Sequence, residues 1–421
     1  MSESPKAARR TVARHAQLTS PHPVAQLVKL LAVAVAVVLV STAGTAAFAA
    51  WNAVETASAN SVTLEGDEQL PPSIGEIEGG VNLLLVGTDS CEGQSLKLFP
   101  RCGHDDGGER NDVTMLVHIG DDPRRVTVVS FPRDMLVPIP SCPDGNGGRY
   151  AAMSAQPMNA TYMYGGLPCT VLTIEALTGL NIQFAASIRW TGVINMSDAI
   201  GGVDVCVDAD ISDKHTGLKL TKGTHTLKGA KALQFLRIRH GIGDGSDLGR
   251  ISNQQQFISS MVRKLQSEEV LSNPATLFNL ANTALQQVNK KQLVLSDNLA
   301  NPTRMVQIAM AVKDVELEDI VLVQYPTAYD GPDTVLPRTA EAKVLFKALK
   351  KNKAIKLTGK LSQGMSQEDK GSVEEDSTST PTPDASATST KSEKSDDVVE
   401  LPSAITGQTA ATRTCTTPQT G

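Results

Sequence analysis

The stretch NDVTMLVHIGDDPRRVTVVSFPRD, residues 111–134, predicts two β-strands and the turn between them. Residues 114–119 and 124–131 are rich in β-branched and apolar residues, which favour strands. The GDDPR sequence where they meet has good turn chemistry, so the two strands should form a hairpin. Upstream, residues 81–86 are a short apolar run bounded by glycine, as expected for a further buried strand.

Predicted helices alternate with strands downstream of this hairpin. Residues 169–180 predict a helix that ends at Gly179, and residues 191–207 predict a helix, a glycine break and a strand. Residues 227–239 predict a helix that runs into another strand, and residues 246–266 predict a helix with Ser246 or Asp247 as its N-cap. Strands that alternate with helices predict an α/β sandwich.

The two ends of the chain differ in composition from the middle. No charged residue occurs from Leu30 to Val54, which is long enough for a transmembrane helix, and the basic residues before it predict a cytoplasmic N-terminus. The alternative is a signal peptide cleaved near Ala47–Ala49; in both cases the main domain would be exported. The predicted segments are a basic cytoplasmic segment (1–29), a transmembrane helix (30–50), a stalk (51–78), a catalytic domain (79–360) and a disordered, acidic Ser/Thr/Pro tail (361–421).

The charge distribution and the missing motifs exclude several function classes. The chain of 421 residues has a net charge of −6, and residues 362–400 carry ten acids against three lysines, about −7 by subtraction. No large basic field is present, so we expect no nucleic-acid partner. The sequence contains no HExxH, GxSxG or Walker A motif, and its seven histidines do not cluster.

Six cysteines in an exported chain favour disulfide bonds over a metal site, since none forms a CxxC pair. Six cysteines allow 15 pairings, and proximity in the sequence favours two of them. We predict that Cys91 pairs with Cys102 and that Cys142 pairs with Cys169. Cys415 would then fold back onto a core cysteine such as Cys206.

Acidic and basic residues gather at the predicted strand ends, where α/β proteins bind ligands. Asp89 follows the first strand and Asp112 precedes the second, so the pair would suit Mg²⁺, which takes one or two carboxylates. Arg133 and Asp134 follow the third strand. The sequence therefore predicts a metal site beside an arginine.

Further arginines point to an anionic ligand. On a strand, Arg237 and Arg239 would share one face, where two guanidinium groups repel each other unless an anion lies between them. On a helix, Arg250 and Gln254 would also share a face, with Asp247 either bracing Arg250 or capping the helix. Carboxylates for a metal and arginines for phosphate are the requirements of phosphoryl transfer.

Six motifs in this order resemble the LytR-CpsA-Psr family over residues 80–270. The motifs are LLLVGTDS, RNDVTMLVHI, VVSFPRDMLVPIP, MNATYMYGG, AIGGVDVCVD and LRIRHGIGDGSDLGRISNQQQF. The resemblance implies an α/β/α sandwich with a central mixed sheet and an apolar groove for a polyprenyl chain. It implies an extracytoplasmic, membrane-anchored phosphotransferase that moves a polyprenyl-pyrophosphate-linked glycopolymer, such as teichoic acid or capsule, onto peptidoglycan with Mg²⁺.

The family's functional residues carry over onto matching positions of this chain. The resemblance implies that Asp89 and Asp112 bind the metal. It also implies that phosphate contacts come from Arg133, Arg237, Arg239, Arg250 and Gln254, and that Arg110 either contacts phosphate or is structural. We expect Arg133, Asp134, Arg237 and Arg239 to be the catalytic residues. The family often has a lysine where this chain has Pro157, so one phosphate contact is either missing or supplied by Lys97, Arg101 or Arg149.

Three other functions remain open at this point. A polyprenyl-pyrophosphate phosphatase would use the same site with water as the acceptor. A membrane-bound transcriptional regulator has only the short basic N-terminus in its favour. A binding module would present wall polymers without chemistry. The base that deprotonates the acceptor hydroxyl is also open, with Asp134 and a carboxylate-held water as the alternatives.

Overall fold

A computed structural model describes residues 23–66, 70–71, 73–74, 80–104, 108–267, 270–331, 333–368 and 398–419. The chain divides into one unit that ends at Asn52 and a second that begins at Ala53. Helix α1 (Pro23–Ala59) spans this division. No helix in the described part of the chain is both long and apolar enough to cross a membrane, so the predicted transmembrane helix over 30–50 is not confirmed.

A seven-stranded mixed sheet forms the centre of the second unit. Its strands in chain order are β1 (Val81–Thr88), β2 (Asn111–Ile119), β3 (Val126–Phe131), β8 (Phe184–Ile188), β13 (Leu293–Leu295), β14 (Ile320–Gln324) and β20 (Gly407–Thr409). Their spatial order is β13-β8-β1-β2-β3-β14-β20. The predicted hairpin is confirmed because β2 pairs antiparallel with β3, while β8 and β14 run parallel to β1 and β3.

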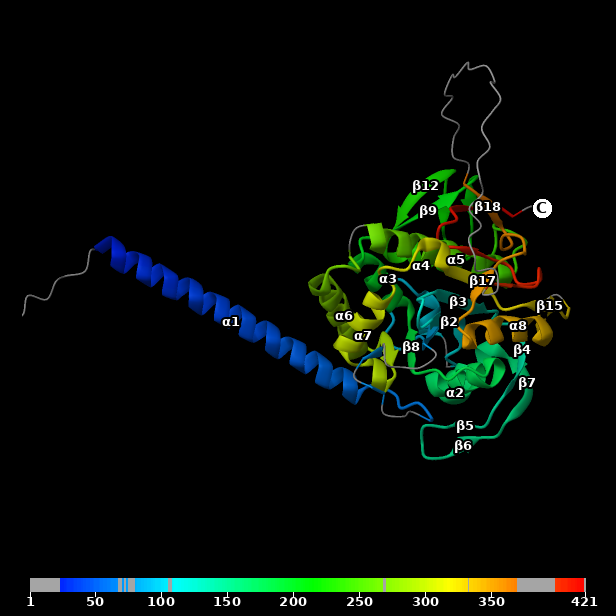
Figure 1. Cartoon of the computed structure of the whole chain (residues 1–421), viewed down its shortest axis with the longest axis horizontal. Helices are drawn as coiled ribbons and strands as arrows, with labels where there is room; N and C mark the ends of the chain where they lie inside the picture. Colours follow the sequence, from blue (N-terminus) through cyan, green and yellow to red (C-terminus); the bar gives the residue numbers. More distant parts are fainter. Residues whose placement is uncertain are drawn as a thin grey trace, which may run out of the picture. The chain divides into compact units, whose positions relative to one another are not determined.

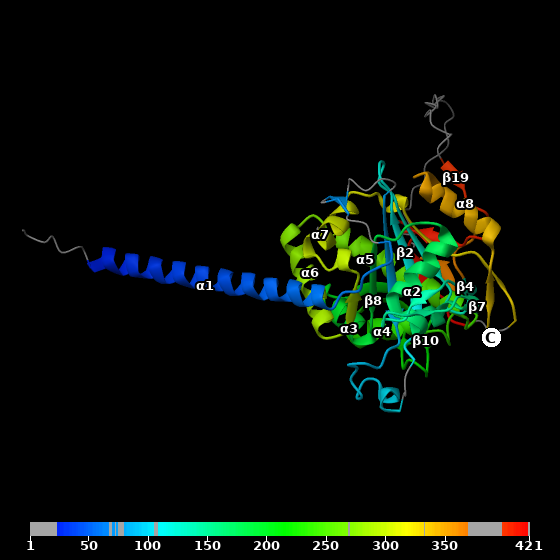
Figure 2. The same cartoon turned by 90° about the horizontal axis from the view of Figure 1, so that it is seen from below.

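Helices cover both faces of this sheet (Figures 1 and 2). They are α2 (Thr161–Thr178), α3 (Trp190–Ala199), α4 (Gly229–Arg237), α5 (Asp247–Ser267), α6 (Pro274–Asn289), α7 (Pro302–Ala311) and α8 (Thr339–Lys350). Helices α2 and α8 pack on one face, and α6 and α7 pack on the other. Helix α2 ends where predicted, because Gly179 takes the left-handed conformation at its C-cap. The predicted α/β sandwich with a central mixed sheet is therefore confirmed.

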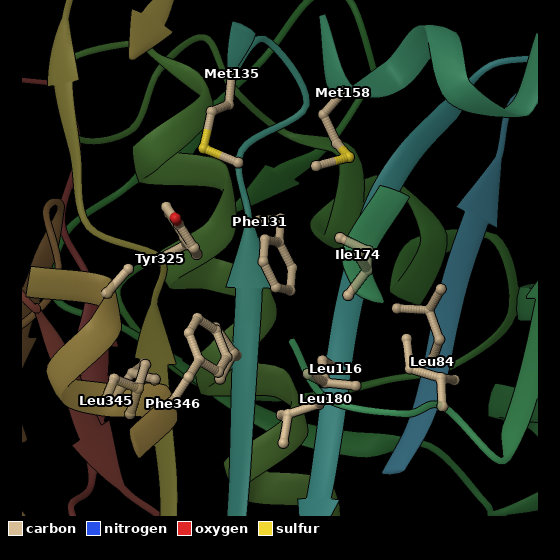
Figure 3. Close-up of a cluster of buried hydrophobic side chains, with 14 of the residues drawn as sticks. Leu84, Leu116, Phe131, Met135, Met158, Ile174, Leu180, Tyr325, Leu345 and Phe346 are labelled. Carbon is tan, nitrogen blue, oxygen red and sulfur yellow. The ribbon is translucent and has the colours of Figure 1, made fainter. Parts of the chain in front are cut away.

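The core between the sheet and helices α2 and α8 is built from large apolar side chains (Figure 3). Leu84, Leu116 and Phe131 project from three adjacent strands of the sheet and are almost fully buried. Ile174 of α2 and Phe346 of α8 pack against them from the helical layer. Burial of each such side chain stabilises the fold by about 1.5–3 kcal/mol. This core fixes the ends of β1, β2 and β3, where the predicted site residues lie.

A second sheet, of order β12-β9-β21-β18, includes the end of the chain. Its strands are β9 (Val203–Val207), β12 (Gly223–Leu227), β18 (Met365–Gln367) and β21 (Thr414–Thr416). The remaining short strands are β4 (Leu136–Ile139), β5 (Cys142–Pro143), β6 (Arg149–Tyr150), β7 (Met153–Pro157), β10 (Ile211–Ser212), β11 (Lys219–Leu220), β15 (Thr327–Tyr329), β16 (Val335–Pro337), β17 (Ala354–Lys356) and β19 (Val398–Glu400).

The predicted boundaries at both ends of the catalytic domain need correction. Residues 398–419 are folded, since β20 joins the central sheet and β21 joins the second sheet. The tail prediction for 361–421 is therefore wrong for this part, while residues 369–397 lie outside the described residues. The predicted stalk also belongs partly to the domain, because Leu64 lies in the core and Ser61 donates to Asp297.

All three predicted disulfides are present: Cys91–Cys102, Cys142–Cys169 and Cys206–Cys415. The third links positions 209 residues apart and joins β21 to β9. A disulfide that closes a loop of this length removes much conformational freedom from the unfolded chain. The C-terminal residues are thus covalently part of the domain.

Candidate active site

Asp112 lies at an irregularity in the ladder between β1 and β2. Gly87 pairs with Val113 and Thr88 pairs with Asn111, so Asp112 has no residue opposite it. An extra residue of this kind is a β-bulge, which turns a side chain out of the regular alternation of the strand. The bulge places Asp112 at the sheet end, where its carboxylate accepts from Arg133 and its backbone oxygen accepts from Arg250.

Asp89 lies immediately beyond the end of β1, next to this bulge. Its N–H donates to the carbonyl of Arg110 at 3.1 Å, and its Oδ1 accepts the N–H of Arg110 at 2.9 Å. The register of the ladder therefore brings Asp89 and Asp112 to the same end of the same strand pair. The exposed Arg110 fixes Asp89 through its backbone, and its predicted phosphate contact stays a prediction.

Arg133 is surrounded by three carboxylates. Its Nη1 donates to Asp112 Oδ1 at 2.6 Å, and its Nε lies 3.4 Å from Asp134 Oδ1 and 3.8 Å from Asp247 Oδ1. Its backbone N–H also donates to Asp247 Oδ2 at 3.1 Å. These contacts hold the guanidinium group of Arg133 in one position at the end of β3.

Asp247 and Arg250 form a buried ion pair in the first turn of α5. Asp247 Oδ1 lies 2.6 Å from Arg250 Nη2, and the two side chains are only 7% and 5% exposed. The same Arg250 Nη2 donates to the backbone oxygen of Asp112 at 2.6 Å. Of the two roles predicted for Asp247, the structure shows the brace, and this brace connects α5 to β2 and β3.

Arg237 and Arg239 do not lie on a strand, so that prediction was wrong. Helix α4 continues to Arg237, and its C-cap residue Ile238 is extended. The helix persists because Ala232, Leu233 and Phe235 are buried at helical spacing, which outweighs the Arg-Ile-Arg alternation at its end. The two arginines nevertheless lie close to the carboxylates of Asp112 and Asp134, with Arg237 lining one cavity beside Arg250 and Arg239 lining another beside Asp247. We call Arg133, Arg237, Arg239 and Arg250, with their aspartate partners, the arginine cluster.

An apolar cavity of about 250 Å³ opens beside Arg237. Arg237 also stacks on Trp190, with its guanidinium carbon 4.3 Å from the ring centroid. Leu85, on a central strand of the sheet, is 37% exposed, which is unusual for a leucine facing a helical layer. The lining of the apolar cavity is mostly apolar with a polar end: Leu85, Val86, Gly87, Thr88, Val113, Met115, Ile188, Trp190, Val193, Leu233, Leu236, Phe257, Ile258 and Met261 with Asp112, Arg237, Arg250 and Gln254.

Two arginines of the cluster have donors that are buried and unused. Within the described residues, the Nε–H groups of Arg239 and Arg250 find no hydrogen-bond acceptor. Leaving a buried charged donor unsatisfied costs about 1–3 kcal/mol or more. An anion with several acceptor oxygens would satisfy both groups, and phosphate is the anion that arginine binds most specifically.

The carboxylates of the cluster differ in pKa. Burial tends to raise the pKa of Asp112, but the guanidinium groups of Arg250 and Arg133 outweigh it and hold the pKa below its ordinary value. At Asp134, burial and then the nearby Asp247 carboxylate raise the pKa, against the opposing effect of Arg133. Asp112 is therefore the more persistent anion, and Asp134 is the better proton acceptor.

Two other residues that were predicted to contact phosphate, Gln254 and Arg149, bind protein groups in the structure. The amide of Gln254 donates to the backbone oxygen of Leu236 at 3.1 Å and so ties α5 to α4 at the polar end of the apolar cavity. Arg149, a candidate to replace the missing lysine at Pro157, binds the carboxylate of Glu65. Arg149 thus does not contact the arginine cluster.

The sequence analysis missed the contribution of the C-terminus to this site. Gln419 exchanges two hydrogen bonds with Gly241, each 3.0 Å long, and the N–H of Gly243 donates to Thr417 at 3.3 Å. The glycine-rich loop after Arg239 is therefore held by residues just beyond Cys415. The only indication of this contact in the sequence analysis was the prediction that Cys415 folds back onto a core cysteine.

Comparison with known proteins agrees with this architecture. Residues 47–353 match the LytR_cpsA_psr family, and the chain belongs to that family. It is 29% identical to "Probable cell wall biosynthesis protein LcpB" of Corynebacterium glutamicum, over 64% of this chain and 61% of the relative. It is also 29% identical to the cell wall biosynthesis protein LcpA of the same organism, over 50% of this chain and 45% of the relative. The chain thus spans about half to three fifths of these relatives.

Among solved structures, the crystal structure of B. subtilis TagV shares the fold. The TM-score is 0.50 at 21% identity, over 64% of this chain and 96% of TagV. At this level of identity the likeness concerns the fold alone. It is consistent with the mixed sheet between two helical layers described above.

Proposed function

We propose that this protein transfers a glycopolymer from a polyprenyl-pyrophosphate carrier to a hydroxyl group of peptidoglycan and releases polyprenyl phosphate. The observation that carries the proposal is the apolar cavity whose polar end is formed by Asp112, Arg237 and Arg250. One ligand that suits both parts at once has an apolar chain joined to a polyanionic headgroup. A lipid-linked pyrophosphate has this composition.

The apolar part of the donor would replace water along the cavity. Leu85 is already solvent-exposed, so covering it with hydrocarbon gains free energy at about 25 cal/mol per Å² of apolar surface. The cavity begins beside β1 and extends between α4 and α5, whose residues Leu236 and Met261 also line it. A chain of isoprene units has the shape and chemistry that such a lining favours.

The arginines would stabilise the charge that develops on the leaving phosphate. Arg133 and Arg250 are held in place by carboxylates before any ligand binds, so little reorganisation is needed during the reaction. Arg239 has an unused donor and would contact the pyrophosphate directly. Interactions of this kind accelerate the reaction where they are stronger in the transition state than in the ground state.

The transfer itself needs one displacement at phosphorus. The acceptor hydroxyl oxygen forms a bond to the phosphorus that carries the glycan, and the bond from that phosphorus to the bridging oxygen breaks. The electron pair of the broken bond leaves with polyprenyl phosphate, and the hydroxyl proton passes to Asp134. The raised pKa of Asp134 supports it as the proton acceptor over Asp112.

Magnesium is part of the proposal, with Asp89 and Asp112 as its protein ligands. No group of three or more metal-ligating side chains occurs in the part of the chain that the structure describes. Mg²⁺ does not require one, since it typically takes one or two carboxylates and completes its shell with water and phosphate oxygens. The lowered pKa of Asp112 fits a cation ligand. When bound, the ion would neutralise charge on the phosphates.

The substrate class and the location are supported by independent features. Two relatives are named as cell wall biosynthesis proteins, which favours a wall glycopolymer as the transferred group. Three disulfides favour a location outside the cytoplasm, because thiols stay reduced inside most cells. A disulfide-bonded exterior domain fits an enzyme that acts on the assembled wall better than a transcriptional regulator.

The decisive experiment uses the purified protein with a lipid-linked glycan, peptidoglycan glycan strands and Mg²⁺. A transferase forms a glycan–peptidoglycan phosphodiester and releases polyprenyl phosphate, and Arg239→Ala abolishes both products. A phosphatase releases polyprenyl phosphate at the same rate with and without the strands. A binding module produces neither product, and this result would refute the proposal.

A further inference from the structure

We propose that a second cavity, across the Asp247–Arg250 pair from the apolar cavity, binds the sugar that carries the acceptor hydroxyl. This inference rests on the proposed transferase function and names the place of its second substrate. The second cavity has a volume of about 360 Å³. Asp134, Arg239 and Asp247 of the arginine cluster form one side of it, and Asp244, Ser246 and Tyr329 form another.

The lining of the second cavity suits an uncharged sugar. Asp134 and Asp244 offer carboxylate oxygens as acceptors for sugar hydroxyls, and Ser246 offers a hydroxyl. A second polyanion is disfavoured there because four carboxylates, those of Asp134, Asp244, Asp247 and Asp333, line the cavity against the single guanidinium group of Arg239. The apolar cavity differs, since its polar groups are confined to one end and the rest of its lining offers few partners to sugar hydroxyls.

Tyr329 supplies an apolar surface within this polar cavity. The side chain is 55% exposed, and its hydroxyl donates to Asp244 Oδ2 at 3.0 Å. An exposed aromatic ring fixed by its hydroxyl presents a rigid face on which a sugar ring can pack. Aromatic side chains with a few precisely placed polar groups are the usual means of orienting a small ligand in a pocket.

The position of Tyr329 is coupled to the catalytic residues through the backbone. Tyr329 lies in the hairpin of β15 and β16, and the N–H of Val335 in this hairpin donates to the carbonyl of Asp134 at 3.3 Å. Met135, the next residue, forms a β-bridge with Val335. A sugar on Tyr329 would therefore be held at a fixed distance from the Asp134 carboxylate.

The geometry of displacement at phosphorus assigns this cavity to the acceptor. Attacking and leaving oxygens lie roughly in line on opposite sides of the phosphorus. If the lipid occupies the apolar cavity, the leaving oxygen is on that side of the arginine cluster. The attacking hydroxyl must then approach from the other side, where the second cavity lies beside Asp134 and Arg239.

The test compares Tyr329→Ala with Tyr329→Phe in the full-length protein. The ring face is lost in the first variant and kept in the second. Because Tyr329 is exposed, we expect both variants to fold, and urea unfolding checks this. With lipid-linked glycan as donor and soluble peptidoglycan strands as acceptor, Tyr329→Ala should raise the acceptor KM about tenfold, equivalent to 1.4 kcal/mol. The donor KM should not change, and Tyr329→Phe, which keeps the ring but loses the hydrogen bond to Asp244, should raise the acceptor KM less than Tyr329→Ala does.

Other outcomes overturn the assignment in distinguishable ways. A rise in the donor KM alone would assign the cavity to the glycan of the donor, and unchanged kinetics would show that the cavity is not used. Binding of the strands without donor, measured by calorimetry, gives a readout that does not depend on transfer. If the wild type binds strands through Tyr329 but never transfers, the proposed function fails and the subsite stands; if the wild type does not bind strands, the subsite fails.

Discussion

Asp247→Ala tests whether one buried carboxylate holds the arginine cluster together. The side chain lies 2.6 Å from Arg250 and accepts the backbone N–H of Arg133 at 3.1 Å. Both Asp247 and Arg250 are almost fully buried. The substitution therefore leaves the Arg250 guanidinium group buried without its charge partner.

The expected cost follows from the burial of the pair. Removing one partner of a buried ion pair typically destabilises a protein by about 3–5 kcal/mol, because the remaining charge is uncompensated. We expect the free energy of unfolding to fall by this amount. Neutralising both partners, as in Asp247→Leu with Arg250→Met, should cost less than Asp247→Ala alone, since neither member of the ion pair is then left buried without the other.

Urea unfolding followed by circular dichroism measures these differences. Asp210→Ala is the matched control, because Asp210 also accepts one backbone N–H, from Lys222 at 2.8 Å, but is exposed and pairs with no arginine among the described residues. Its loss should cost about 1 kcal/mol. Inorganic pyrophosphate should restore part of the stability of Asp247→Ala by binding the unpaired guanidinium groups. A loss for Asp247→Ala no larger than that of the control would refute the reasoning.

Three further predictions address the apolar cavity, the proton acceptor and the C-terminal segment. Leu85→Asn should weaken binding of the lipid donor with little loss of stability, because Leu85 is already exposed, whereas Leu85→Ile should keep wild-type affinity; equal affinities would contradict the lipid site. Activity should fall as the pH drops through the pKa of Asp134, which lies above the usual value of about 3.9, since protonation removes the proton acceptor. Asp134→Asn should remove this acidic limb along with most of the rate, and an unchanged pH profile would exclude the role. Cys206→Ser with Cys415→Ser should lower the free energy of unfolding by about 2–5 kcal/mol and slow transfer, because the loop after Arg239 is bonded to residues beyond Cys415.

The parts of the fold that the sequence predicted well are those with strong local patterns. The hairpin of β2 and β3 combines two apolar strands with a turn rich in polar residues and proline, and each feature agrees with the others. The prediction of a strand at Arg237 was wrong because it relied on only three alternating residues. The longer helical pattern before them buries one face of α4, and this burial stabilises the helix as far as Arg237. Strands of three residues, such as β20 and β21, carry too little periodicity to be found this way.

The candidate site shows a similar division. The sequence predicted which charged residues would gather, because strand ends and helix spacing are local properties. It did not predict the second cavity, since Tyr329 and Asp134 are brought together by a bridge between segments almost 200 residues apart. Asp247 was ambiguous for the same reason, because only tertiary structure shows that Arg133 and Arg250 both contact it.

The four arginines of the cluster should not be equivalent, and lysine substitutions can separate them. Arg250 uses one nitrogen to contact both Asp247 and the backbone of Asp112, a geometry that the flexible point charge of lysine does not reproduce. Arg250→Lys should therefore lower the free energy of unfolding, measured in urea, as well as the rate of transfer. Arg239 has a buried Nε–H without an acceptor in the described part of the chain, so Arg239→Lys should leave stability intact and weaken donor binding. The reverse result, with Arg239→Lys unstable and Arg250→Lys stable but weak in binding, would mean that the ligand is held by the braced arginine and that the assignment of roles within the cluster is inverted.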